Sequence, residues 1–147
     1  MLGIIADVRK STMDAKFNKE DFSALDDETV VDLLELACTE NRLDLIKHML
    51  QRGLDINRKL SVEDIIRDEE IFTHPTCIAV DCMSNNDTGI LCYLLEQGAD
   101  INNGYQLCWY VIGHMTEYET LLDYAQNQNN HAAINVIEEH IAKYKQE

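Results

Sequence analysis

The sequence Gly-x-Asp-Ile-Asn occurs twice, and this recurrence constrains the fold of the chain more than any other feature. It runs from Gly53 to Asn57 and again from Gly98 to Asn102, each time directly after an apolar stretch with helical spacing. A glycine in this place adopts, at little cost, the left-handed conformation in which many helices end. Two identical helix stops in one short chain predict an internally repeated helical unit.

Three segments read as the same unit, which is a helix, a tight turn and a second helix. They cover residues 33–57, 74–102 and 120–143. In the first, apolar residues keep helical spacing on both sides of a polar break from Thr39 to Arg42, which predicts a turn between antiparallel helices. Pro75, the only proline, opens the second segment, where the first turn of a helix tolerates its missing N–H.

This unit resembles the ankyrin repeat, whose pattern runs Thr-Pro-Leu-His-x-Ala, a polar turn, a second helix and a Gly-Ala-Asp-x-Asn tail. The tail is the most specific part of the resemblance, and Pro75 falls on the proline of the pattern. The histidine position departs from it, because it holds Glu35, Cys77 and Asp123, and the threonine survives only as Thr120. The hydrogen bonds that usually join neighbouring repeats are therefore not expected from the histidine position.

The resemblance implies an all-α fold, an ankyrin-type solenoid of helix–turn–helix repeats in a single domain over 1–147. Repeat 1 would occupy 29–57, repeat 2 would occupy 74–102, and 120–147 would hold repeat 3 and a C-terminal cap that begins near His131. Residues 1–28 would form an N-terminal capping helix, because so short a stack leaves apolar faces open at both ends. The apolar residues available for that cap are Leu2, Ile4, Ile5, Val8, Phe17 and Phe22.

Two insertions separate the repeats. Gly53 and Gly98 lie 45 residues apart, whereas the ankyrin period is about 33 residues. The extra residues fall at 58–73 and 103–119. Ser61 and Asp64 have the spacing of a helix capping box, so each insertion is expected to form either a short inserted helix or an extended finger.

Acidic residues dominate the charge of the chain. It holds 27 Asp and Glu against 12 Lys and Arg, for a formal net charge of −15, and the 75 residues between Arg67 and Lys143 contain 12 acids and no Lys or Arg. Nucleic acid and anionic membranes are disfavoured as partners, because both are bound through basic residues. The acids either attract a cationic partner or only keep the protein in solution.

The cysteines and the absence of a long apolar run indicate an unexported chain. No stretch approaches the roughly 20 apolar residues of a membrane span. Five cysteines are an odd number, and most lie in apolar stretches where a free thiol packs as a small hydrophobe. A cytoplasmic location and a monomer when unbound are expected.

The strongest candidate for chemistry is the cluster His74, Cys77 and Cys82, spaced His-x2-Cys-x4-Cys. Zinc would need a fourth ligand such as Cys108 or His114, and a thiol enzyme would need Cys77 activated by His74. The repeat pattern explains the same spacing by helix packing. We therefore expect no catalytic residue, no metal and no cofactor, and a protein that is not an enzyme.

Binding residues are expected in the insertions, because the ankyrin resemblance implies recognition through the first helices and the fingers. Acids and aromatic anchors there suit a basic protein partner. The alternative is that Leu107, Trp109, Val111 and Ile112 only add to the core. The expected partner-binding residues are Glu63, Asp64, Asp68, Glu69, Glu70, Tyr105, Trp109, Tyr110, Glu117, Tyr118 and Glu119.

Three kinds of function are compatible with such a protein. Small acidic single-domain chains of this kind resemble the immunity proteins that bacteria pair with toxins, so the first is an interaction module that binds and inhibits a basic protein such as a toxin. Within the same class, a viral or bacterial ankyrin effector would engage host proteins. The metal or thiol enzyme built on Cys77 and a purely structural oligomer are the alternatives from other classes.

Overall fold

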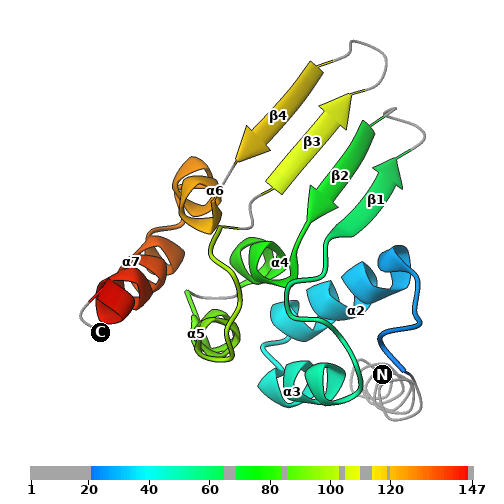
Figure 1. Cartoon of the computed structure of the whole chain (residues 1–147), viewed down its shortest axis with the longest axis horizontal. Helices are drawn as coiled ribbons and strands as arrows, with labels where there is room; N and C mark the ends of the chain where they lie inside the picture. The colour runs from blue at the N-terminus through cyan, green and yellow to red at the C-terminus, as the bar shows by residue number, and fades with distance from the viewer. Residues whose placement is uncertain are drawn as a thin grey trace, which may run out of the picture.

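The computed structural model describes residues 21–64, 69–83, 86–102, 105–109, 114–118 and 120–145. This part of the chain is mostly helical and carries one small antiparallel sheet (Figure 1). In chain order the elements are α2 (Asp27–Thr39), α3 (Leu43–Gln51), β1 (Leu60–Asp64), β2 (Glu69–Thr73), α4 (Pro75–Cys82), α5 (Gly89–Glu96), β3 (Tyr105–Trp109), β4 (His114–Tyr118), α6 (Leu121–Asn127) and α7 (His131–Lys145). None of the described helices is long and apolar enough to cross a membrane.

The helices form two layers of antiparallel pairs. Helices α2, α4 and α6, here called the inner helices, stack in chain order, and the outer helices α3, α5 and α7 stack beside them (Figure 1). Ala37, Ala79 and Ala125 occupy the same place in the three inner helices and are at most 1% exposed. A methyl side chain there lets neighbouring helices pack closely without a void.

The first two helix pairs end in the same way. Gly53 and Gly98 have φ of 105° and 97°, and the following N–H groups of Leu54 and Ala99 donate to Met49 and Leu94 at 3.0 and 3.1 Å. This is the hydrogen bond of a Schellman helix end, as expected at both glycines.

The turns inside the pairs use asparagine instead of glycine, which the sequence pattern did not indicate. Asn41, Asn86 and Asn129 have φ of 53°, 59° and 53°, a conformation that asparagine tolerates better than most residues. The expected break between Thr39 and Arg42 is confirmed, since α2 ends at Thr39 and α3 begins directly after Arg42.

The Gly-x-Asp-Ile-Asn tails connect neighbouring pairs. The Asp55 and Asp100 carboxylates each accept the N–H two residues ahead at 2.9 Å. The Asn57 side-chain oxygen then accepts the N–H of Asp100 at 2.8 Å, and the N–H of Leu121 donates to Ile101 O at 2.9 Å. These tails therefore supply hydrogen bonds between consecutive units.

Both insertions form β-hairpins, and the two hairpins pair with each other. The sheet order is β1-β2-β3-β4, with all strands antiparallel. The expectation of an all-α chain is therefore wrong for the insertions, and of the two forms considered for them the finger is correct. Ser61 caps no helix, because its Oγ donates to Glu70 Oε1 across the hairpin at 2.8 Å. Each hairpin is stabilised by the neighbouring one, since an isolated hairpin is only marginally stable. We call this sheet the finger sheet.

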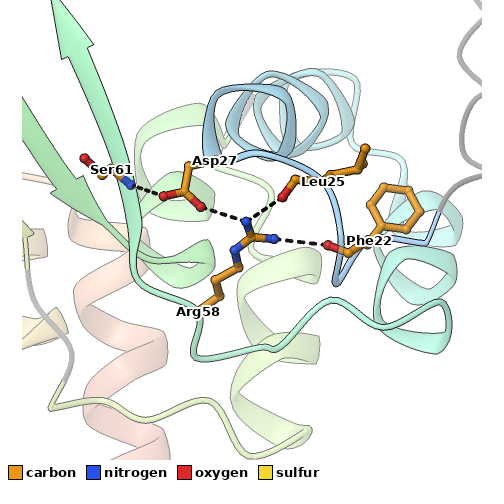
Figure 2. Close-up of polar contacts among 5 residues, drawn as sticks. All are labelled: Phe22, Leu25, Asp27, Arg58 and Ser61. Carbon is orange, nitrogen blue, oxygen red and sulfur yellow. Dashed lines mark hydrogen bonds and ion pairs between the residues drawn. The ribbon is translucent and has the colours of Figure 1, made fainter.

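Arg58 ties the finger sheet to the start of α2 (Figure 2). Its guanidinium donates to Phe22 O at 3.0 Å and to Leu25 O at 2.6 Å, and it pairs with Asp27 at 2.8 Å. The other oxygen of Asp27 accepts the N–H of Ser61, in β1, at 3.1 Å. One side chain thereby fixes the segment before α2, the first turn of α2 and the base of β1.

The two ends of the chain are described unequally. Of the N-terminal capping residues, Leu2, Ile4, Ile5, Val8 and Phe17 lie outside the described residues, whereas Phe22 is fully buried. At the other end α7 begins at His131 as expected, with Ala133 and Ile137 fully buried and Glu138 and Glu139 exposed.

Replacing either glycine with alanine should destabilise the fold, and Gly53→Ala should cost more. Gly98→Ala carries only the cost of a left-handed non-glycine residue, about 1–2 kcal/mol, because a Cβ there meets nothing within 4 Å. At Gly53 a Cβ would also lie 2.9 Å from Asp21 Oδ1 and 3.3 Å from Ser23 Cβ. Urea unfolding measures the free energy of unfolding of the two variants. Equal losses would show that the contacts with Asp21 and Ser23 add no cost at position 53.

Candidate protein-binding surface

The finger sheet brings several of the predicted acids together. Glu63 lies opposite Glu70 and Asp64 opposite Glu69 in the β1–β2 register. Glu63 is exposed, whereas Glu69 and Glu70 are half-buried. Like charges that face each other across a strand pair are destabilising, so this hairpin holds negative charge at a cost in stability that a cation would relieve.

The register also divides the predicted residues between the two faces of the sheet. Neighbouring residues of a strand point to opposite faces, so Glu117 and Tyr118 are separated. Glu117 shares its face with Glu63 and Glu70. Tyr118 shares the other face with Val62, and both pack against the helical core. The residues were expected to form one patch, whereas the strand register places them on two faces of the sheet.

The remaining predicted residues are only partly described. The structure gives Asp64, Tyr105 and Trp109 a backbone position alone, with Trp109 opposite Glu69 and Tyr105 opposite Tyr118. Asp68, Tyr110 and Glu119 lie outside the described residues, as do Val111 and Ile112 of the alternative core layer.

A line of contacts that the sequence did not indicate crosses the inner helices. The ring of Tyr118 lies 5.8 Å from that of Tyr124 on α6, measured between centroids. The Tyr124 hydroxyl donates to the carboxylate of Asp81 on α4, and Asp81 in turn feels the charge of Glu35 on α2. The sequence did not indicate these contacts because a single Asp in a helix forms no recognisable pattern, and because Tyr124 lies 43 residues from Asp81.

The surroundings of Asp81 and Glu35 disfavour the ionised form of both carboxyl groups. Desolvation raises the pKa of Asp81, the Tyr124 hydrogen bond lowers it, and the charge of Glu35 raises it again. Desolvation likewise raises the pKa of Glu35, with a further increase from Asp32. Carboxylates gathered in this way favour a bound cation. Asp32, Glu35 and Asp81 all have surface that a partner can reach, and the Asp81 carboxylate is partly buried against Tyr124.

Asp81→Asn should stabilise the chain at neutral pH. Because the folded pKa of Asp81 lies above its ordinary value of 3.8, the ionised form opposes folding. That penalty is absent below the ordinary pKa and appears as pH rises through the folded pKa. An amide oxygen can still accept from Tyr124, and the gain stays below about 1 kcal/mol for so accessible a group.

Thermal unfolding between pH 3 and 7 measures the effect of Asp81→Asn. The advantage of the variant should vanish at the acid end. Glu139→Gln, an exposed acid on α7, is the control for loss of one negative charge. A variant that is less stable than the parent at neutral pH would contradict the claim that the ionised Asp81 carboxylate destabilises the fold.

The predicted alternative of a metal or thiol site rests on His74, Cys77 and Cys82. His74 precedes α4 and Cys82 ends it. Cys77 is fully buried, and burial raises the pKa of its thiol to about 12, so the thiolate that nucleophilic chemistry requires is not formed at neutral pH. Within the described ranges, no group of three or more His, Cys, Asp or Glu is arranged to hold a metal ion.

Alkylation should distinguish the cysteines by burial. Cys38 is 3% exposed, and burial, with smaller contributions from Cys82 and Glu35, raises its pKa to about 12. Cys82 and Cys92 are half-buried. Iodoacetamide at pH 8, followed by peptide mass spectrometry, should modify Cys82 and Cys92 while Cys38 and Cys77 stay unmodified. Early modification of Cys77 would revive the thiol alternative.

Comparisons of this sequence and structure with protein-family models, with curated proteins and with solved structures find no match. The function is therefore inferred from the residues of the chain and their geometry.

Proposed function

We propose that the chain is an ankyrin-type repeat protein that binds a basic protein and acts by covering part of its surface. Three features support the ankyrin assignment. The helices form stacked antiparallel pairs, two of the pairs end in a left-handed glycine, and each tail bonds the next unit, Asn57 to Asp100 of the second tail and Ile101 to Leu121 of α6. Side-by-side hairpins between the pairs fit the same assignment.

The observation that carries the binding proposal is that acids gather on the inner helices and, separately, on one face of the finger sheet. Glu35 and Asp81 lie on the inner helices with raised pKa values, and Glu63, Glu70 and Glu117 share one face of the finger sheet. Lys or Arg side chains of a partner would offset this repulsion. The net charge of −15 would also steer a basic protein toward the chain.

Inhibition by covering a surface requires no catalytic groups in the chain. A rigid acidic surface placed over a basic cleft excludes that cleft's substrate without any chemistry by the inhibitor. The packed helix pairs and the Arg58 anchor favour such a preformed surface, because rigidity lowers the entropic cost of association. We accordingly propose a role like that of an immunity protein that neutralises a toxin.

Affinity capture at two ionic strengths tests the proposal. The immobilised chain is exposed to the lysate of its source cells at about 10 mM and 150 mM salt, between which the Debye length falls from about 30 to about 8 Å. A basic protein retained strongly at low salt and weakly at high salt is expected.

Matched variants locate the charges that matter. The triple variant Glu35→Gln, Asp81→Asn and Glu117→Gln removes three acids from the proposed surface. The control Glu96→Gln, Glu138→Gln and Glu139→Gln removes three exposed acids from the outer helices. Only the first should lose the partner. Equal retention by both variants would reject the surface, and retention that does not depend on salt would reject the charge argument.

A further inference from the structure

A hollow of about 630 Å³ is lined by the end of α4, by Met83 and Asn86, and by the turn from α6 to α7 with the first residues of α7. It is at the ends of α4 and α6 that point away from the finger sheet, since both helices begin next to a hairpin strand. Its volume falls within the range of about 300–1,000 Å³ typical of ligand sites. Neither the proposed function nor the sequence pattern makes use of it.

The contacts between neighbouring turns explain why the hollow forms at this place. Between the first two pairs the turns are tied together, because Asn41 Nδ2 donates to Asp87, which also accepts the N–H of Gly89 at 3.0 Å. Asp87 follows the left-handed Asn86, and Asn130 follows Asn129 in the same way. Asn130 instead donates to Val80 O at 3.0 Å. The second and third turns therefore stay apart, and the space between them is open.

The walls of the hollow are fixed by hydrogen bonds. Asn130 bonds α4 through Val80 O and caps α7 by accepting the N–H of Ala133 at 3.1 Å. The carboxylate of Asp81 is oriented by the Tyr124 hydroxyl. A ligand would therefore find the Asn130 and Asp81 side chains already oriented.

Carboxamides dominate the lining. Asn86, Gln128, Asn129 and Asn135 are exposed around the hollow, and in the part of the chain that the structure describes their side chains make no hydrogen bond. A carboxamide offers two donors and an acceptor, which matches the N–H and C=O of a peptide group. Asp81 adds one negative charge to the wall.

We infer that the hollow binds a short peptide segment carrying a lysine or an arginine, with the carboxamides on its peptide groups and Asp81 paired with its cation. The inference rests on the proposed function, because such a segment would belong to the basic partner. It names a specific anchor, distinct from the broad charge attraction of the finger sheet. Occupation would also relieve the desolvated carboxylate of Asp81.

A titration followed by NMR tests the site. The ¹⁵N-labelled chain is titrated with acetyl-Gly-Arg-Gly-amide, and acetyl-Gly-Glu-Gly-amide is the control peptide. The arginine peptide should shift the side-chain amide signals of Asn86, Gln128, Asn129 and Asn135 in a saturable way, and the glutamate peptide should not. Asp81→Asn should weaken the arginine peptide about tenfold, the scale of one lost charge-assisted contact. Glu96→Gln should leave its binding unchanged.

The outcomes separate the two proposals. Shifts that are absent at millimolar peptide, that fall on other residues, or that survive Asp81→Asn in a folded variant would overturn the hollow as a site. The variant's own spectrum shows whether it is folded. If the chain nevertheless retains a basic protein in a salt-sensitive way, the proposed function stands without this anchor. If neither the peptide nor a basic protein binds, both proposals fail.

Discussion

Arg58→Ala should destabilise the chain by about 2–4 kcal/mol, because hydrogen bonds to a charged group contribute about 1.5–3 kcal/mol and the variant loses several at once. The guanidinium holds Phe22 O, Leu25 O and Asp27, and the side chains of Arg58 and Asp27 are only 21% and 31% exposed. Asp27 would keep only the contact to Ser61 N. Urea unfolding measures the loss.

Two variants make this result specific to the geometry of Arg58. Arg58→Lys keeps the charge but lacks the planar fork that reaches several acceptors, so its loss should be intermediate. Arg42→Ala removes a comparable ion pair to Asp44, which is 67% exposed, and should cost less than about 1 kcal/mol. A loss for Arg58→Ala no greater than that for Arg42→Ala would show that the anchor of the finger sheet lies elsewhere.

Leu60→Ala should cost about 2–5 kcal/mol, the usual range for truncating a buried leucine. Leu60 is fully buried at the base of β1, where the strand meets α2. The loosened base should also speed amide exchange in β1 and β2, since their hydrogen bonds depend on that contact. Both effects are measurable on the same protein, by urea unfolding and by hydrogen exchange.

Val62→Ala is the matched control for Leu60→Ala. Val62 points to the same face of β1 and packs against the core, but it is only half-buried. Its truncation should cost less than half as much and leave exchange in β2 near the parental rate. Equal losses at the two positions would mean that the sheet is not anchored at its base.

Local signals carried most of the helical prediction. Gly53, Gly98 and Pro75 each punctuate a helix through their own backbone restrictions, and those restrictions act within a few residues. The asparagine turns escaped notice because Asn adopts positive φ less uniformly than Gly. The finger sheet was harder to predict, since β2 finds a partner in β3, and Phe72 pairs with Gln106 across 34 positions of sequence.

The candidate site was predictable in composition but not in geometry. Acids in the insertions pointed to a charged surface, yet their division between two faces follows from strand alternation, which applies only once the finger form is known. The line from Tyr118 through Tyr124 to Asp81 depends on helix stacking. The anchoring role of Arg58 could not be predicted from the sequence, because two of its acceptors are backbone oxygens.

Hydrogen exchange of the chain, alone and with the basic protein that it retains, tests most directly whether the inner helices and the finger sheet form the binding surface. Slower exchange is expected in 32–39, 60–73, 78–82 and 114–124, with the outer helices α3, α5 and α7 unchanged except at the His131 end of α7 beside the hollow. Protection confined to the outer helices, or the absence of any basic partner, would contradict the proposed function.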